Sequence, residues 1–355
     1  MSRSYLLAVP FLLAACVAAC NKPSAVAPPT PQDSATFDPD GTAHVTRTVP
    51  MPATLSPEAQ KWLASLANST PGPEDLATRR KRTDEWRTRQ SAEALRLFPV
   101  KIESVTTAGV PTDIITPLET SASNRDLVLI DLHGGGFNSD SGSLIEGDPI
   151  ANLAKIKVVS VYYRLAPENP FPAAVDDVVA VYKELLKTHK PRNIGIFGTS
   201  AGAILTGEVV VRLKQLKLPL PAALGLFSTL ADYSHPADSQ QLFTLNGFPG
   251  VLKPQDPNGA IGEEYAGKTD RKDPVLSPIY ADLKGMPPTL LVSSTRDLLL
   301  SDTALFHRAL LRAGVDARLV VFEALPHAFW YHFELLETTE ALDLMAKFFD
   351  EKLGH

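Results

Sequence analysis

Ser200 is the strongest candidate nucleophile, because it lies at the centre of the sequence GTSAG, Gly198–Gly202. A β-rich run, Asn193–Phe197, precedes this pentapeptide, and an amphipathic segment follows it. In that setting the pattern predicts a tight strand-to-helix turn, in which the glycines avoid steric clashes and the serine hydroxyl stays clear of the sheet. The backbone N–H of Ala201 would then face any anion that forms beside the serine. The alternative is a Gly-Ser helix start without chemistry.

A serine hydroxyl needs a base to accept its proton, and a histidine base needs an acid to fix its tautomer. His327 is the best candidate base, because it lies between the last predicted strand and the final predicted helix. Asp297 follows the preceding predicted strand and is the candidate acid. Asp302 competes with it, although a position at the start of a helix suits interaction with the helix dipole. The remaining candidate histidines lack such a loop position: His44, His189, His235, His307, His332 and His355.

Three consecutive glycines form a second motif, HGGGF, at His133–Phe137. Glycines cost conformational entropy and are expected where backbone must approach a ligand closely. The N–H groups of Gly135 and Gly136 are therefore predicted to form an oxyanion hole together with that of Ala201. A phosphate cradle is the rival interpretation. No GKS or GKT sequence accompanies the glycines, and no acidic residue follows at dinucleotide-binding spacing.

Short β-rich runs alternate with helical segments after Pro99, and they must position these motifs. The predicted strands are Val100–Thr106, Thr112–Thr116, Leu127–Leu132, Lys157–Tyr162, Asn193–Phe197, Ala222–Phe227, Thr289–Ser293 and Ala317–Phe322. Apolar faces predict helices around Val175–Leu186, Ile204–Leu213, Leu305–Leu311 and Leu342–Phe349. This alternation predicts an α/β fold with a mostly parallel central sheet flanked by helices, and with catalytic loops at the carboxyl ends of the strands.

Two segments are predicted to add a helical cap. Residues 51–98 contain signals for two helices, the first with Ser56 as its N-cap and the second running from Glu74 to Leu97. The charged residues Arg79–Arg82 on the second helix are interpreted as a solvated face rather than a binding patch. An insertion near residues 231–279, rich in Pro, Gly and scattered Phe, interrupts the catalytic domain of residues 99–355.

The charge and hydropathy of the chain exclude some classes of protein. With 34 Lys and Arg against 40 Asp and Glu, the net charge is -6, and no basic face is evident. A nucleic-acid partner is therefore not expected, because its phosphates require clustered cations. Hydrophobic residues make up 44% of the chain, which is enough for a sizeable core and excludes wholesale disorder.

The first 20 residues are expected to be a signal peptide, because Arg3 precedes an apolar run, Tyr5–Ala19, that is too short to span a bilayer. Small residues precede both cysteines of the chain, as in bacterial lipoprotein signals. Cys20 is the favoured lipidation site, and Cys16 is the alternative. Residues 21–50, rich in Pro, Ser and Thr, are predicted to be a disordered tether. We therefore expect an exported protein of the periplasm or cell envelope, anchored to a membrane by lipid.

Taken together, HGGGF, the tract Tyr163–Glu168 (YRLAPE), GTSAG and the loops of Asp297 and His327 resemble the bacterial hormone-sensitive-lipase-like esterases of the GTSAG type. The resemblance extends over roughly residues 99–353. It implies a capped α/β-hydrolase that cleaves small-molecule esters with short to medium acyl groups, without metal or cofactor. It also implies Ser200, Asp297 and His327 as the catalytic triad, and the amides named above as the oxyanion hole.

The chain departs from this family in details that remove no catalytic group. Thr199 stands where many relatives carry Asp, Leu298 where many carry Pro, and Ala328 where Gly is common. Glu168 and His133 are expected to brace the loops rather than react with substrate. The alternative activities are hydrolysis of lactones, carbamates, thioesters or amides, or, in another class, a non-catalytic binding lipoprotein with this fold.

Overall fold

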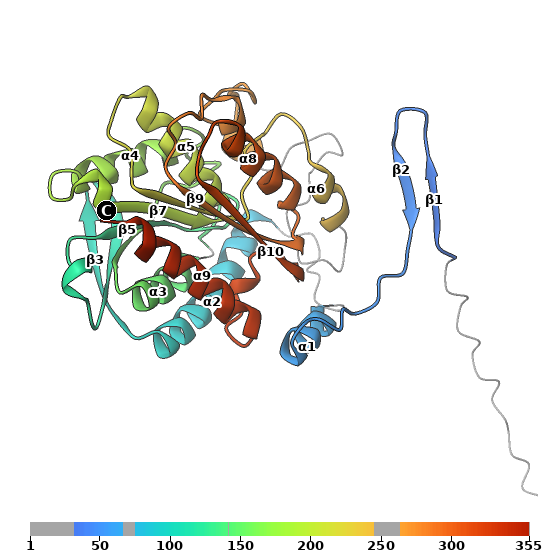
Figure 1. Ribbon diagram of the computed structural model, residues 1–355, viewed down its shortest axis with the longest axis horizontal. Coiled ribbons are helices and arrows are strands. Elements are labelled where there is room, and N and C mark those ends of the chain that lie inside the picture. The colour runs from blue at the N-terminus through green and yellow to red at the C-terminus, as the bar shows by residue number, and fades with distance from the viewer. Residues whose placement is uncertain (1–31, 67–74, 141, 245–262, 355) are drawn as a thin grey trace, which may run out of the picture. The chain divides into compact units, whose positions relative to one another are not determined.

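The structure is a computed structural model that describes residues 32–66, 75–140, 142–244 and 263–354 (Figure 1). The chain divides into two compact units, Met1–Met51 and Pro52–His355. The predicted signal peptide, Cys16 and Cys20 lie outside the described residues. No helix of the described ranges is both long and apolar enough to cross a membrane.

The first unit contains a β-hairpin, so the prediction of a disordered tether over residues 21–50 is wrong for its central part. Strands β1 (Ser34–Phe37) and β2 (Ala43–Thr46) pair antiparallel. The turn between them contains Gly41 at φ +91°, a conformation that glycine adopts without steric cost. Asp38 closes the turn, because its N–H donates to the carbonyl of Thr42 (2.9 Å). The hairpin was not predicted because the Pro and Ser residues on both sides of it give the segment the composition of a linker.

The second unit is built on an eight-stranded sheet with the order β10-β9-β8-β7-β5-β6-β4-β3. Its strands are β3 (Val100–Thr107), β4 (Val110–Pro117), β5 (Val128–Leu132), β6 (Lys157–Val161), β7 (Ile194–Thr199), β8 (Ala223–Phe227), β9 (Thr289–Arg296) and β10 (Ala317–Pro326). All pairs from β5 to β10 are parallel, whereas β4 runs antiparallel to both β3 and β6. The predicted strands and the mostly parallel α/β sheet are therefore confirmed.

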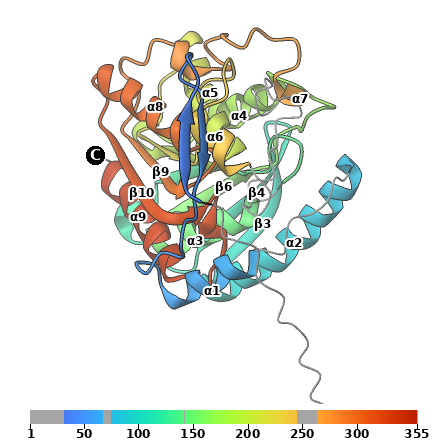
Figure 2. The ribbon, with the colours of Figure 1, turned by 90° about the vertical axis from the view of Figure 1, so that its right-hand side faces the viewer.

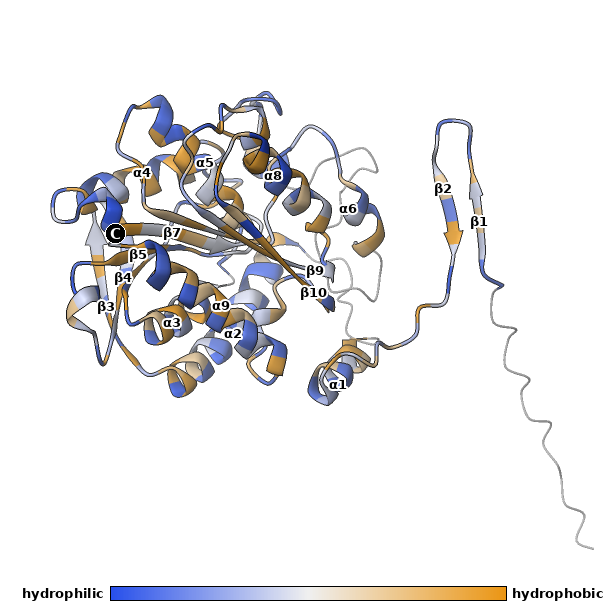
Figure 3. Cartoon of the chain, in the orientation of Figure 1, coloured by the Kyte–Doolittle hydropathy of each residue, from blue (hydrophilic) through white to orange (hydrophobic). Residues whose placement is uncertain are grey.

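Helices cover both faces of this sheet (Figures 1 and 2). The helices are α1 (Pro57–Leu66), α2 (Leu76–Leu97), α3 (Ser143–Ala154), α4 (Ala173–Leu185), α5 (Ala201–Gln215), α6 (Asp238–Phe243), α7 (Glu263–Ala266), α8 (Leu300–Arg312) and α9 (Leu336–Lys352). Residues of α4, α5 and α8 share one hydrophobic core cluster, while residues of α1, α3 and α9 share the other. Apolar residues line the central strands between these layers (Figure 3). The buried sheet is therefore a rigid support for the loops at its carboxyl edge.

The N-terminal helices begin close to where the sequence predicts. Ser56 caps α1, since its Oγ accepts the N–H of Ala59 (3.1 Å), and Asp75 caps α2 by accepting the N–H of Thr78 (2.7 Å). The insertion near residues 231–279 contributes the short helices α6 and α7, and its residues 245–262 lie outside the described ranges.

Helix α3 was not predicted. Its sequence contains Gly147 and Pro149, two of the poorest residues for a helix interior, which interrupt the expected pattern. Burial compensates for this weak propensity, because nine of the 12 residues of α3 are buried. Asp140 also stabilises the N-terminus, where its Oδ1 accepts the N–H groups of Gly142 and Ser143, each at 3.1 Å.

Candidate active site

Three side chains from distant parts of the sequence meet at the carboxyl edge of the sheet. The Nε2 of His327 lies 2.9 Å from the Oγ of Ser200, and its Nδ1 lies 2.8 Å from the Oδ1 of Asp297. Ser200 follows β7, Asp297 follows β9, and His327 follows β10. The hydrogen bonds are continuous, so a proton can pass from the serine hydroxyl to an imidazole that a carboxylate holds in place.

The turn at Ser200 is strained and sterically constrained. The residue has φ +58° and ψ -120°, which a side chain with a Cβ rarely adopts. The N–H of Ser200 donates to the carbonyl of Phe227 (2.9 Å), which ties the turn to β8. A Cβ on Gly198 or Gly202 would lie 2.3 Å or 1.6 Å from the carbonyl oxygen of Leu132. Both glycines of the motif are thus required by the close approach of β5.

Asp297 is fully buried, and both of its carboxylate oxygens are hydrogen-bonded. Its Oδ1 accepts the N–H of Leu299 (2.9 Å) in addition to His327, and its Oδ2 accepts the hydroxyls of Ser293 (2.8 Å) and Ser228. Burial acts to raise the pKa of Asp297, but the His327 ring and these donors hold the pKa below its ordinary value. The acid is therefore ionised at neutral pH.

Asp302, the competing acid, does not join this group. It is buried at the start of α8 and accepts a hydrogen bond from the side-chain amide of Gln240 (2.7 Å) on α6. Burial raises the pKa of Asp302 to about 7. Its contact links the insertion to the catalytic domain.

Three of the alternative histidines have other partners within the second unit. His307 contacts the carbonyl of Ala317 (3.2 Å), and the ring of His332 lies 4.4 Å from that of Trp62, between centroids. His189 contacts the hydroxyl of Thr188 (2.9 Å), and His44 lies in β2. His355 lies outside the described ranges.

The HGGGF loop adopts backbone conformations that favour glycine. Gly135 has φ +117° and Gly136 has φ +64°. A Cβ on Gly135 would lie 2.0 Å from the carbonyl oxygen of Ser139, so no other residue fits without moving the loop. The carbonyl of Gly135 accepts the N–H of Ser139 (3.2 Å) and of Asn138 (3.3 Å), which closes the loop into a tight turn.

His133 braces this loop from below. Its Nδ1–H donates to the carbonyl of Gly134 (2.8 Å), which fixes the peptide plane that also carries the N–H of Gly135. The ring stacks on Tyr163 with centroids 4.2 Å apart, and the Tyr163 hydroxyl donates to the carbonyl of His133 (2.7 Å). His133 therefore orients the loop and does not contact Ser200.

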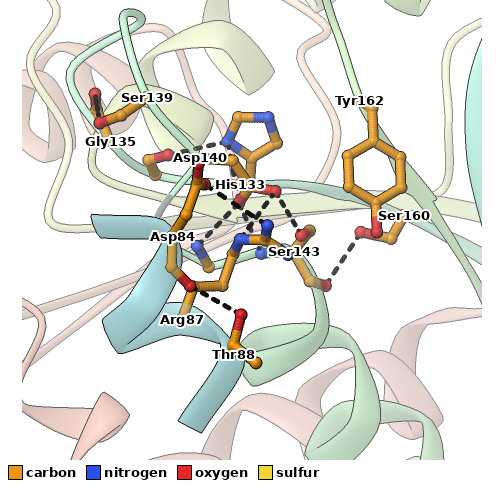
Figure 4. A network of polar contacts seen from close by, with 12 residues as sticks. Asp84, Arg87, Thr88, His133, Gly135, Ser139, Asp140, Ser143, Ser160 and Tyr162 are labelled. Atoms are coloured by element: carbon orange, nitrogen blue, oxygen red, sulfur yellow. Dashed lines mark hydrogen bonds and ion pairs between the residues drawn. The ribbon is translucent and has the colours of Figure 1, made fainter. Parts of the chain in front are cut away.

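A buried polar network continues behind the loop (Figure 4). Asp140 lies 3.6 Å from both the Nδ1 of His133 and the Nε of Arg87, and it accepts the hydroxyl of Ser143 (2.6 Å). Burial acts to raise the pKa of Asp140, but these three neighbours hold the pKa below its ordinary value. The carbonyl of Ser143 in turn accepts the hydroxyl of Ser160 (2.9 Å) on β6.

Arg80 of α2 docks on the catalytic domain, so the interpretation of Arg79–Arg82 as a solvated face is wrong for this residue. Its guanidinium forms a bidentate pair with Glu168, with both distances 2.7 Å. It also donates to the carbonyls of Ala166 (2.9 Å) and Asn138 (2.6 Å). The hydrogen bonds from Arg80 lower the pKa of Glu168 to about 2. Glu168 thus joins α2 to the YRLAPE tract, away from the three reacting side chains.

No group of three or more His, Cys, Asp or Glu side chains that could hold a metal ion occurs in the part of the chain that the structure describes. The reactive groups that the structure brings together at the carboxyl edge are the Ser200 hydroxyl, the His327 imidazole and the Asp297 carboxylate.

Comparisons with known proteins identify relatives of this chain. A family model described as the alpha/beta hydrolase fold matches residues 129–331. An acetyl-hydrolase of Streptomyces hygroscopicus is 32% identical over 64% of this chain and 76% of its own length. An esterase of Acinetobacter venetianus is 30% identical over 71% of this chain and 84% of its own.

Solved structures agree with the sequence relatives. The crystal structure of esterase E25 has a TM-score of 0.76 and 33% identity, and the match covers 87% of this chain and 98% of that one. EstE5, soaked with p-nitrophenyl butyrate, has a TM-score of 0.73 and 28% identity, covering 83% and 98%. A third match, described as an esterase of the bacterial hormone-sensitive lipase family, has a TM-score of 0.69 and 29% identity, covering 84% of this chain and 99% of that one. The predicted resemblance is confirmed. The chain belongs to the α/β-hydrolase fold family and is similar to esterases of the bacterial hormone-sensitive lipase family.

Proposed function

We propose that this chain hydrolyses carboxylic esters with short to medium acyl groups through an acyl intermediate on Ser200. The observation that carries the proposal is the continuous set of hydrogen bonds from Ser200 through His327 to Asp297, at 2.9 Å and 2.8 Å. Such distances allow proton transfer during nucleophilic attack.

In the first half of the reaction, the Oγ of Ser200 attacks the ester carbonyl carbon as its proton moves to the Nε2 of His327. The carbonyl electron pair moves onto oxygen, and the N–H groups of Gly135, Gly136 and Ala201 stabilise the resulting anion. Each such donor is typically worth about 10²–10³-fold in turnover. The tetrahedral intermediate then collapses, and the leaving alkoxide takes the proton from His327.

In the second half, His327 accepts a proton from water, and the hydroxide attacks the acyl carbon. The carboxylic acid leaves, and the proton returns to the Oγ of Ser200. Asp297 stabilises the imidazolium in both halves, since its lowered pKa keeps it ionised.

Relatives support the choice of ester and of acyl length. Proteins similar to this chain are named acetyl-hydrolase, esterase and carboxylesterase. The description of the EstE5 structure names p-nitrophenyl butyrate, a four-carbon acyl ester. A small-molecule ester with a short acyl group is therefore the substrate class we assign.

A panel of p-nitrophenyl esters of increasing acyl length tests the assignment. We expect the largest kcat/KM between two and eight carbons, and loss of activity in Ser200→Ala. An organophosphate should label Ser200 in the wild type, and peptide mass spectrometry can identify the labelled residue. Full activity in Ser200→Ala, or a preference for sixteen-carbon acyl chains, would overturn the proposal.

We also propose that the protein is exported and lipid-anchored in the cell envelope through Cys20, with Cys16 as the alternative. The support is the sequence of the first 20 residues, in which an apolar run leads to small residues before each cysteine. Metabolic labelling with a radioactive fatty acid should mark the wild type, and Cys20→Ala should abolish the label. Loss of label only in Cys16→Ala would select the alternative site, and an unlabelled wild type would refute the anchor.

A further inference from the structure

We propose that Glu146 of α3 is a positioning residue for ester hydrolysis, which holds the turn of Ser200 and the loop of His327 in one arrangement. The inference rests on the proposed function and adds to it a residue outside the recognised motifs. Glu146 is almost completely buried, at 3% exposure, and belongs to the helix that the sequence did not predict.

The carboxyl group of Glu146 lies where three catalytic loops meet. Its Oε1 accepts the hydroxyl of Tyr331, from the short turn that follows His327. Burial raises the pKa of Glu146 to about 8, and the Thr199 hydroxyl and the Gly134 N–H lie close enough to the carboxyl to oppose this rise, as the Tyr331 hydroxyl does. The second oxygen, Oε2, accepts no hydrogen bond from the described part of the chain. Thr199 belongs to the Ser200 turn, and Gly134 belongs to the HGGGF loop. One side chain therefore contacts or adjoins the segments that carry the nucleophile, the base and the oxyanion amides.

A glycine, Gly142, leaves space for the contact between Glu146 and Tyr331. A Cβ on Gly142 would lie 2.3 Å from the Oε1 of Glu146 and 2.6 Å from the Oη of Tyr331, so only glycine leaves room for the pair. Burial, together with the adjacent Glu146, raises the pKa of Tyr331 well above its ordinary value. The hydroxyl therefore keeps its proton and remains the donor.

A second hydrogen bond joins the same loops directly. The indole Nε1–H of Trp330 donates to the Oγ1 of Thr199 (3.0 Å). Thr199 precedes the nucleophile, and Tyr331 lies four residues after the base. Backbone bonds within the turn, such as the Tyr331 N–H to the carbonyl of Ala328 (3.1 Å), transmit the position of the Tyr331 ring to the segment beside His327.

Loss of this connection should affect turnover more than binding. A displacement of about 1 Å between reacting groups can cost 10²-fold in rate, because catalysis needs the nucleophile and base in a narrow range of geometries. Glu146 is only 3% exposed, so we expect its loss to leave substrate affinity largely unchanged. The expected signature is a lower kcat with an unchanged KM.

Asp148 offers a matched control on the same helix. It is equally buried, at 1% exposure, and its carboxyl oxygens accept no hydrogen bond from the described part of the chain. The charged neighbour that affects its pKa is Asp113 of β4, away from the catalytic loops. Truncation of Asp148 thus removes a buried carboxyl from α3 without removing a contact to the site.

The experiment measures kcat, KM for p-nitrophenyl butyrate, and the unfolding temperature of each full-length variant. We expect kcat to fall about 10–100-fold in Glu146→Ala with KM within twofold of wild type. Glu146→Gln should recover most of this loss, because its amide oxygen can still accept the Tyr331 hydroxyl. Tyr331→Phe, which removes only that hydroxyl, should lower kcat at least fivefold, and Asp148→Ala should leave kcat within twofold.

The inference is overturned if Tyr331→Phe leaves kcat within twofold of wild type, or if Asp148→Ala loses as much as Glu146→Ala. Should Glu146→Ala fail to fold, Tyr331→Phe with a wild-type unfolding temperature decides the question alone. Either failure leaves the wild-type esterase activity and its loss in Ser200→Ala intact, so it is distinguishable from failure of the proposed function.

Discussion

The hydroxyl of Ser228 donates to the Oδ2 of Asp297, the carboxylate oxygen opposite the one that faces His327. Ser228 follows β8 directly, at φ +54°, and its own N–H donates to the carbonyl of Val292 on β9 (2.7 Å). A residue at the end of the neighbouring strand β8 thus fixes the position of the Asp297 carboxylate. Ser228 lies outside every recognised motif, and together with Ser293 and the Leu299 N–H it orients the carboxylate toward the imidazole.

Ser228→Ala tests the importance of this contact. The alanine retains a Cβ and therefore the same backbone strain, so the variant removes only the donated hydrogen bond. A hydrogen bond to a charged group contributes about 1.5–3 kcal/mol. Because Ser293 still donates to the same oxygen, we expect only part of this loss in turnover, a fall in kcat of about 3–30-fold. Steady-state kinetics with a short p-nitrophenyl ester measures the effect.

Ser293→Ala serves as the companion variant, because Ser293 donates to the same Oδ2 atom at 2.8 Å. We expect the double variant to be more impaired than either single one, since Asp297 then keeps only its contacts through Oδ1. A wild-type kcat in the double variant would contradict the assigned role of both hydroxyls.

The buried carboxyls outside the triad predict a stability that decreases with rising pH. Burial raises the pKa of Asp148 to about 8 and that of Asp302 to about 7. In the unfolded chain these groups titrate near pH 4, so between about pH 4 and 8 the folded state binds more protons and the free energy of unfolding falls as pH rises. Carboxyls with lowered pKa values, such as Asp297, are ionised in both states above about pH 6 and do not contribute there.

Asp148→Asn isolates one of these groups. The amide cannot ionise, so the variant should gain stability relative to wild type, and the gain should grow by on the order of 4 kcal/mol between pH 5 and pH 8.5. Chemical denaturation at the two pH values measures the difference. A gain independent of pH would show that the carboxyl does not titrate in this range.

The sequence predicted the sheet and the reacting residues for a physical reason. Central parallel strands are buried on both faces and therefore appear as uninterrupted apolar runs, and the motifs stand at their ends. Helix α3 was missed because Gly147 and Pro149 weaken its local signal, and only its packing against the sheet compensates. Ser228 and Ser293 were missed because a single serine carries no pattern, and its partner is fixed only when the strands align.

The sequence likewise could not predict the docking of α2, because Arg80 and Glu168 are 88 residues apart. Arg80→Met keeps most of the side-chain bulk but removes the bonds to Glu168, Ala166 and Asn138. We expect this variant to lose about 1–3 kcal/mol of unfolding free energy and several-fold in kcat/KM, because Asn138 adjoins the HGGGF loop.

Arg96→Met is the control for that experiment. Arg96 lies on the same helix and pairs with exposed Glu93 at i,i+3. Exposed pairs of this kind contribute about 0–1 kcal/mol, so both stability and kcat/KM should stay near wild type. Equal losses in the two variants would mean that the charge of α2, not its docking, matters.

Gly135→Ala tests whether the shape of the HGGGF loop supports catalysis. At φ +117°, with its Cβ 2.0 Å from the carbonyl oxygen of Ser139, an alanine must move the loop and displace the N–H groups of residues 135 and 136. Loss of one oxyanion donor costs about 10²–10³-fold in kcat, and we expect an effect of at least that size.

Gly314→Ala provides the comparison, since Gly314 also has a positive φ, +76°, but open space around its Cβ position. That variant should lose about 1 kcal/mol of stability and retain its kcat. If both variants keep wild-type turnover, the amides of this loop do not stabilise the transition state, and the donors must be sought elsewhere at the edge of the sheet.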